Sequence, residues 1–270
     1  MPSLKSFPAY EVKRCPACEC RDAKHFDKRN GYELIRCARC QMVYTRNVPS
    51  TEQLCDFYNE LYVRTGKPLE ATVQRTFHRR WKYQLLASYL KWLHPKEQKI
   101  RLLEIASSDG DLLEAVAGDP RFIATGIDYS EDNVAYCRRQ GWNALVTDLE
   151  SAPFYEQTFD AIVALHVVEH LQNPIRTINE AHRVLRPGGY FFAVMPCISH
   201  LKARLAGLRW KYIAPPGHLW YFTPKSLSLL MNRLGFEVCW ANCFYHRAHL
   251  RILARKPVSA AKARELKKAA

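Results

Sequence analysis

The sequence lacks any run of about 20 apolar residues, the length that an α-helix needs to span a bilayer. Its first residues also lack the apolar stretch of a signal peptide, since Lys5, Glu11 and Lys13 lie there among prolines. The chain has 270 residues, 48% of them hydrophobic, so it can bury a full core in one or two domains. These features predict a soluble protein of the cytoplasm.

Disulfide bonds are not expected, although the chain contains ten cysteines. Five of them lie within residues 15–40, and the others occur singly or in one late pair. In a reducing compartment, such clustering is typical of a metal site, whereas scattered cysteines behave as small apolar residues. The cluster is therefore a candidate metal site.

Acidic residues are few compared with basic ones. The chain has 26 Asp and Glu against 40 Lys and Arg, a formal net charge of +14. A basic surface favours anionic partners such as nucleic acid, nucleotide-linked sugars or phosphorylated substrates. Part of the excess lies in a basic tail, residues 257–270, which we expect to be solvated. The charge indicates a class of partner and assigns no function.

Two CxxC pairs, Cys15 with Cys18 and Cys37 with Cys40, are separated by 18 residues. Each CxxC turn presents two thiolates, and two such turns supply the four tetrahedral ligands of a structural zinc ion. Residues 1–50 are therefore predicted to form a zinc ribbon, which its metal stabilises because the unit is too small for a core of its own. A redox role for a CxxC is the weaker alternative, and Cys20 is interpreted as a bystander.

The sequence pattern changes after residue 50. Apolar residues recur at helical spacing across residues 51–97, which predicts a helical connector or cap. From residue 98 to 256, short apolar runs alternate with helical segments, which predicts βαβ units and a parallel sheet. Strands are expected at 100–106, 122–127, 144–146, 161–165 and 190–195, and helices at 111–117, at 174–185 (ended by the turn Arg186–Gly189) and from 224 to Gly235.

Three acidic residues lie at the ends of successive predicted strands: Glu104, Asp128 and Asp148. Because the carboxyl ends of parallel strands meet at one edge of a sheet, where ligands bind, these carboxylates are expected to share a site. A carboxylate at the tip of the second strand suits two hydrogen bonds to a ribose diol. The loop after the first strand lacks GxGxxG, and phosphates would lie against Asp109 and Asp111, which disfavours a nicotinamide cofactor.

Together these marks resemble the class I S-adenosylmethionine (SAM)-dependent methyltransferases over residues 98–256. The segments that carry the resemblance are Leu102–Gly110, Gly126–Asp128, Phe159–Val163, His166–Leu171, Arg183–Gly189 and Gly217–Pro224. The resemblance implies a Rossmann-like α/β sheet of seven strands, the last pair antiparallel, with helices on both faces. With its N-terminal zinc ribbon, the chain is similar to the small-molecule branch that contains ubiquinone-type O-methyltransferases and natural-product and polysaccharide enzymes.

The resemblance also implies a SAM site. Glu104 would lie near the methionine amino group, Asp128 at the ribose and Asp148 at the adenine amino group. The chain departs from the family at Ala106 and Ser108, which replace loop glycines, so positive φ there is costlier. The cofactor-binding residues implied in this way are Glu104, Ala106, Ser107, Ser108, Gly110, Asp128, Tyr129, Asp148, Leu149 and His166.

Methyl transfer from a sulfonium is an in-line displacement, and a hydroxyl acceptor also needs a base. His166, after the fourth strand, is the first candidate base and His218 the second; the alternatives are packing beside the adenosine and ordering of a loop. Glu169 and His170 are expected to begin the next helix in capping and packing roles, although similar residues of ubiquinone-type enzymes are linked to a divalent metal. Residues 198–216, with cations and aromatics, are expected to form a lid suited to an anionic or aromatic acceptor.

The favoured function is O- or N-methylation of a small molecule such as a natural product, a sugar or a glycan precursor. Sugar C-methylation is one alternative, since a similar loop occurs in that branch. Methylation of RNA or another nucleic acid is a second, supported by the charge and the ribbon, but no Asn/Asp-Pro-Pro-aromatic motif follows the fourth strand. The altered loop motivates a third, a non-catalytic zinc-ribbon interaction protein on the same fold.

Overall fold

The computed structural model describes residues 10–50, 52–54, 56–57, 77–94, 99–243 and 248–258. Within these residues, no helix is long and apolar enough to cross a membrane. The connector expected over residues 51–97 is described mainly by helix α2 (Phe77–Leu93). The predicted basic tail lies outside the described residues from residue 259 onward.

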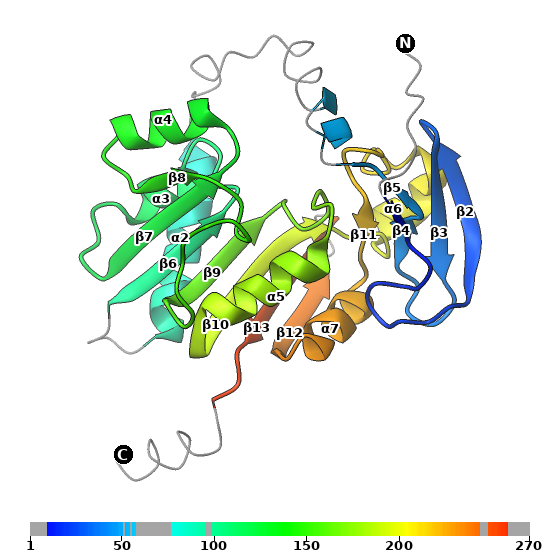
Figure 1. Cartoon of the computed structure of the whole chain (residues 1–270). Coiled ribbons are helices and arrows are strands. Elements are labelled where there is room, and N and C mark those ends of the chain that lie inside the picture. The colour runs from blue at the N-terminus through cyan, green and yellow to red at the C-terminus, as the bar shows by residue number, and fades with distance from the viewer. Residues whose placement is uncertain are drawn as a thin grey trace.

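A seven-stranded sheet forms the centre of the molecule (Figure 1), in the order β12-β13-β10-β9-β6-β7-β8. Its strands are β6 (Ile100–Ile105), β7 (Phe122–Asp128), β8 (Ala144–Val146), β9 (Phe159–Leu165), β10 (Leu185–Pro196), β12 (Glu237–Cys243) and β13 (His249–Arg255). Neighbours from β10 to β8 pair in parallel, whereas β13 runs antiparallel to β10 and to β12. The expected sheet with an antiparallel last pair is confirmed.

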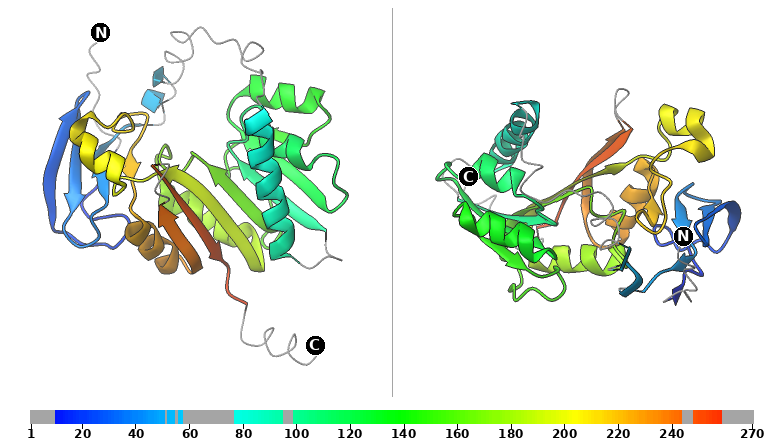
Figure 2. Two further views of the ribbon diagram at one scale, coloured as in Figure 1. Left: turned by 180° about the vertical axis from the view of Figure 1, so that it is seen from behind. Right: turned by 90° about the horizontal axis from the view of Figure 1, so that it is seen from above.

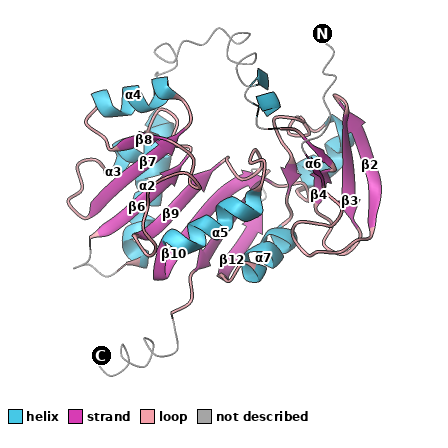
Figure 3. Ribbon diagram, viewed as in Figure 1, coloured by secondary structure: helices cyan, strands magenta, loops and turns pink. Residues whose placement is uncertain are grey.

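Helices cover both faces of the sheet, with α2 on one side and α5 on the other (Figures 2 and 3). They are α2, α3 (Asp111–Val116), α4 (Glu131–Arg139), α5 (Pro174–Val184) and α7 (Pro224–Arg233). Successive side chains of a strand point to opposite faces, so Leu102 packs in a cluster with Leu90 of α2, and Leu103 packs in another with Ile178 of α5. The sheet is thus buried on both faces, as its apolar strands require.

Capping residues fix where the helices begin. Thr223 and Ser226 form a reciprocal capping box at the start of α7, which begins at Pro224 as expected. Asn173 caps α5 by accepting from the Arg176 amide at 3.1 Å. The expectation that Glu169 and His170 begin this helix is therefore wrong, because Asn173 followed by a proline is the stronger start signal.

One predicted turn is instead part of a strand. Arg186–Gly189 lies within β10, where the pairing with β9 shifts register between Leu185 and Tyr190. Gly188 has φ 87°, and a Cβ atom on Gly189 would lie 2.8 Å from the Asp160 carbonyl oxygen. The two glycines thus allow an irregular strand to follow α5 directly.

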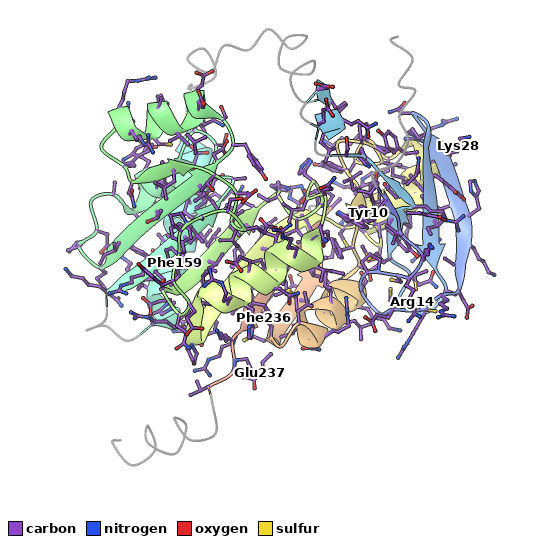
Figure 4. The ribbon with its side chains drawn as sticks, in the orientation of Figure 1. Tyr10, Arg14, Lys28, Phe159, Phe236 and Glu237 are labelled. Carbon is purple, nitrogen blue, oxygen red and sulfur yellow. The ribbon has the colours of Figure 1, made fainter. Side chains whose placement is uncertain are left out.

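The N-terminal ribbon builds a second sheet in the order β11-β4-β3-β2. Its strands are β2 (Ala23–Arg29), β3 (Tyr32–Cys37), β4 (Val43–Thr45) and β11 (Trp220–Tyr221), while β1 (Tyr10–Glu11) pairs with β5 (Asn47–Val48). Because β11 comes from the C-terminal half of the chain, that half supplies one strand of the ribbon sheet. Tyr10 (Figure 4) adds a link, since its hydroxyl donates to the Gln172 carbonyl at 2.6 Å.

Candidate functional site

Four cysteine thiols meet at one end of the ribbon. The Sγ atom of Cys15 lies 3.4 Å from that of Cys40, and Cys18 lies 3.5 Å from Cys37. A tetrahedral zinc ion with Zn–S bonds of about 2.3 Å separates its ligands by about 3.8 Å, so the set fits zinc after a small adjustment. The hydrogen bond between Cys15 and Cys40 lowers the pKa of Cys40 and raises that of Cys15, so without a metal the Cys40 thiol is the one that ionises first.

Glu104 occupies the penultimate position of β6 and is 5% exposed. Its Oε2 atom has no hydrogen-bond partner among the described residues. Burial, together with the charges of Asp111, Asp109 and Asp128, raises the pKa of Glu104 well above its usual value. A buried carboxylate of this kind is stabilised by a ligand that brings a positive charge, such as an ammonium group.

The loop after β6 keeps the conformation of a glycine-rich loop without most of its glycines. Ala106 has φ 52°, Ser108 has φ 50° and Gly110 has φ 74°. The left-handed region costs a non-glycine residue roughly 1–3 kcal/mol, so the two substitutions retain strain at this position. The sequence correctly identified the costly positions, and the structure shows that the backbone bears that cost.

Glycines bring this loop against its neighbours. A Cβ atom on Gly126 of β7 would lie 2.6 Å from Ser107 Oγ, and one on Gly110 would lie 2.8 Å from Cys137 Sγ. Ser107 Oγ is buried and has no hydrogen-bond partner among the described side chains. Among the described residues, Glu104 Oε2 and Ser107 Oγ are thus two buried polar atoms at this loop that have no hydrogen-bond partner.

Asp128 ends β7 and holds the loop in place. Its Oδ2 atom accepts from the Ser108 amide at 2.8 Å, and its Oδ1 atom accepts from the Ser130 amide at 2.9 Å and from Asn133 Nδ2 at 3.2 Å. Such fixed bonds orient the carboxylate at the edge of the sheet.

Asp148 follows β8 and lies beside Tyr129. The Tyr129 hydroxyl donates to Asp148 Oδ2 at 3.0 Å, and the Tyr129 side chain is 71% exposed. Burial of Asp148 is outweighed by hydrogen bonds from Ser151 and from Tyr129, so the pKa of Asp148 is lowered. Leu149, which follows it, is buried and belongs to the core of the large sheet. Tyr129 and Asp148 thus lie at the same edge of the sheet as Glu104 and Asp128, at the carboxyl ends of the strands.

His166 follows β9 at the same edge and has φ 58°. Its amide donates to the Val194 carbonyl at 2.7 Å, and its Nδ1 atom lies 3.5 Å from Glu169 Oε1. Glu169 is 1% exposed, and neither of its carboxylate oxygens has a hydrogen bond among the described residues. A strained histidine beside a buried carboxylate is typical of a functional site.

His218 reaches the same place from the segment before β11. Its ring packs edge-on against His170 with centroids 4.5 Å apart, and its Nδ1 atom lies 2.8 Å from the Tyr212 carbonyl oxygen. Burial, followed by the charge of His170, lowers the pKa of His218. Both predicted bases thus belong to one cluster.

His249 is a member of this cluster that the sequence did not single out. It begins β13, opposite Pro196 of β10. Its ring lies 4.7 Å from that of His166, and its Nε2 atom lies 3.3 Å from the Tyr212 hydroxyl. The position of His249 follows from the pairing of β13 with β10, which the sequence alone does not indicate.

The cluster also has a set of metal-ligating atoms. Glu169, His170 and His218 each offer one such atom, all within 4.8 Å of one another. The Nδ1 atoms of the two histidines face the carbonyls of Gly217 and Tyr212, which leaves each Nε2 atom as the ligand. These residues can hold a divalent cation.

The segment expected to form a lid contains α6 (Leu201–Ala206) and the 3₁₀ turn η2 (Gly207–Arg209). Lys202, Arg204 and Arg209 are exposed, whereas Tyr212 contacts the histidine cluster. Tyr212, one of the aromatic residues expected in the lid, therefore lies at the candidate site.

Comparison of the sequence with known proteins identifies a family and several relatives. Residues 77–239, more than half of the chain, match a family described as a methyltransferase domain. A demethylmenaquinone methyltransferase of Chlorobaculum parvum is 31% identical over 104 residues, which are 38% of this chain and 43% of that protein. A probable tRNA methyltransferase 9B of Homo sapiens is 42% identical over 67 residues, 24% of this chain and 15% of that protein. The chain thus spans less than half the length of these two relatives.

A solved structure shares the fold. A SAM-dependent methyltransferase of Methanosarcina mazei superposes with a TM-score of 0.51 at 22% identity, covering 65% of this chain and 98% of that structure. The family match and the seven-stranded sheet together show that the chain belongs to the class I SAM-dependent methyltransferases.

Proposed function

We propose that the chain transfers the methyl group of SAM to an oxygen or nitrogen atom of a small molecule. The observation that carries this proposal is the pair formed by His166 and Glu169, at the edge of the sheet that also holds Glu104 and Asp128. A base held by a buried carboxylate suits an acceptor whose proton must leave during the transfer.

The cofactor half of the site would use the acidic strand ends. SAM supplies a methyl group activated on a sulfonium. The Glu104 carboxylate, whose Oε2 atom has no hydrogen-bond partner among the described residues, would bind its amino group, Asp128 its ribose and Asp148 its adenine. Lining residues would be Ala106, Ser107, Ser108, Gly110, Tyr129, Leu149 and His166.

His166 would take the proton of the acceptor. Its Nδ1 atom lies 3.5 Å from Glu169 Oε1, and closure of this distance to a hydrogen bond would place the ring hydrogen on Nδ1 and leave a lone pair on Nε2. Glu169 would then stabilise the imidazolium that forms, as a buried carboxylate does in other histidine bases. His218, with its lowered pKa, stays neutral near pH 7 and is the second candidate.

The acceptor class is supported by two features. Tyr212 and His218 stack with an interplanar angle of 9°, and such a flat surface suits a ring-bearing acceptor. The relative from Chlorobaculum parvum carries the name demethylmenaquinone methyltransferase, which agrees with a small-molecule substrate.

The proposed metal is a structural zinc ion held by the four ribbon cysteines.

RNA methylation is the second candidate. It is favoured by the 42% identity to a probable tRNA methyltransferase and by the net charge of +14. An RNA acceptor would make binding strongly dependent on salt concentration, because phosphate contacts release counterions.

Replacing His166 with Asn should lower methylation of a hydroxyl acceptor by about 10²- to 10⁴-fold, the usual contribution of a general base. Transfer of label from radioactive SAM is measured with separate pools of phenols, sugars, amines and total RNA. The matched control is His94→Asn, a half-buried histidine that contacts Asp160 at the opposite edge of the sheet. Full activity of His166→Asn on an oxygen acceptor would contradict the base role, and label found only in RNA would favour the second candidate.

A further inference from the structure

We propose that the zinc ribbon positions the acceptor side of the site, and that Arg29 is the positioning residue that holds the lid. The acceptor side means the cluster of His166, His218 and His249, and the lid means residues 198–216. The inference rests on the proposed function only in giving this cluster its role. Four sets of contacts between the ribbon and the C-terminal half support it.

The first set lies at the tip of the β2–β3 hairpin. The Arg29 guanidinium donates through Nη1 to the Ile213 carbonyl at 2.8 Å and through Nη2 to the Leu208 carbonyl at 2.5 Å. Asp27 pairs with the same guanidinium at 3.1 Å. Asn30 adds a bond to the Pro215 carbonyl at 2.8 Å. A planar guanidinium can hold two carbonyls in a fixed geometry, which a lysine cannot.

The second set is apolar. The lid packs its buried face on the ribbon sheet, and the opposite face of α6 is exposed. The buried residues that meet there form one cluster, with Leu34, Val43 and Tyr221 from the ribbon sheet and Ile198, Ala203, Trp210 and Ile213 from the lid. The lid therefore has its apolar support in the ribbon.

The third set is the strand that the two halves share. Trp220 and Tyr221 of β11 pair with Tyr44 and Val43 of β4, and the Thr45 amide donates to the Leu219 carbonyl at 2.9 Å. The next residue back along the chain is His218. The ribbon therefore holds the backbone on the C-terminal side of this histidine.

The metal end of the ribbon is tied to the same half. Thr223 Oγ1, at the start of α7, donates to the Cys40 carbonyl at 3.4 Å. Arg233 on the same helix pairs with Glu19, in the loop after the first CxxC, at 2.8 Å. Loss of the metal would therefore release contacts on the C-terminal side of His218.

Tyr212 transmits the position of the lid to the cluster. Its ring stacks on His218 with centroids 5.8 Å apart, its carbonyl oxygen faces His218 Nδ1, and its hydroxyl faces His249. The hydrogen bonds that hold Asp128 come from the loop after β6 and from the residues that follow β7. Release of the lid should thus disturb the acceptor side and leave the cofactor side intact.

The test compares Arg29→Gln with Arg46→Gln in the full, zinc-loaded chain. Arg46 is the matched control, because it pairs with Glu33 inside the ribbon at 3.1 Å. Four quantities are measured: amide hydrogen exchange by mass spectrometry, the NMR shifts of the His218 ring protons, SAM affinity by calorimetry and zinc content. None of them requires the acceptor or methyl transfer, so failure of this inference is separate from failure of the proposed function.

Arg29→Gln should speed exchange over residues 207–216 by about tenfold or more. It should also remove the ring-current shift that Tyr212 imposes on His218, with zinc content and SAM affinity unchanged. Arg29→Lys should give an intermediate exchange rate, since it keeps the charge and loses the bidentate contact. Chelation of zinc should likewise speed amide exchange over residues 207–216.

Two results would overturn the inference. One is that Arg29→Gln leaves both the exchange of residues 207–216 and the His218 shifts as they are in Arg46→Gln. The other is that these residues and residues 100–134 lose protection to the same extent in Arg29→Gln, which would mean that Arg29 only stabilises the fold as a whole.

Discussion

Replacement of Glu104 by Gln should weaken SAM binding roughly 10- to 150-fold, because a hydrogen bond between charged groups contributes about 1.5–3 kcal/mol. The same change should stabilise the SAM-free protein. Glu104 is 5% exposed, its Oε2 atom has no hydrogen-bond partner among the described residues, and an isosteric neutral side chain avoids the cost of either burying a charge or retaining a proton. Each kcal/mol gained should raise Tm by about 2–4 °C.

The pH dependence of this gain has a definite sign. The pKa of Glu104 is raised in the folded protein, so the folded state keeps a proton that the unfolded chain gives up above its own pKa of about 4.3. Wild-type stability therefore decreases as pH rises from that value toward the folded pKa. The Gln variant escapes this loss, so its advantage should be larger at about pH 8 than at about pH 4.

Thermal unfolding at the two pH values and calorimetric titration with SAM check this prediction. The matched control is Glu114→Gln, the same chemical change at a half-buried position of α3. A Gln variant that is less stable than wild type at about pH 8, or that binds SAM as tightly as wild type, would refute the assignment of Glu104 as the partner of a cation.

Replacement of Cys37 by Ser should abolish zinc binding and unfold the ribbon. Zinc binding to small four-ligand domains provides about 10–16 kcal/mol, and this binding energy is their folding energy. Cys37 is fully buried among the four thiols, so the remaining three cannot close the site.

The control lies in the same ribbon. Cys20 donates to the Asp22 carbonyl at 3.7 Å and is not one of the four clustered thiols, so Cys20→Ser should retain zinc. Zinc content is measured by mass spectrometry and ribbon folding by circular dichroism. Zinc bound to Cys37→Ser at the wild-type stoichiometry would contradict the four-cysteine site.

The sequence was sufficient where the signal is local. The spacing within each CxxC pair and the start of α7 at Pro224 each depend on residues only a few positions apart in the chain. Periodicity located β6, β7 and β8 closely, since each strand is a short apolar run between turn residues.

What could not be predicted depends on tertiary contacts. Glu169 was interpreted as a helix cap, yet it is 1% exposed and faces His166, because the fold buries the turn before α5. His249 gains its place from the antiparallel register of β13 on β10, and a strand pairing between distant segments leaves no local pattern.

The addition of β11 to the ribbon sheet could likewise not be predicted from the sequence. β11 has only two residues, Trp220 and Tyr221, and pairs with residues more than 170 positions earlier in the chain. No periodicity can be detected in so short a strand. This pairing is what brings His218 and the ribbon together.

The most direct test of the cofactor site is calorimetric titration of the zinc-loaded chain with SAM and with S-adenosylhomocysteine, for wild type and for Asp128→Ala. Micromolar binding by wild type, sharply weakened in the variant, is the expected result. A folded wild-type protein that binds neither compound, or a variant that binds both as tightly as wild type, would contradict the assignment of the acidic strand ends as the SAM site.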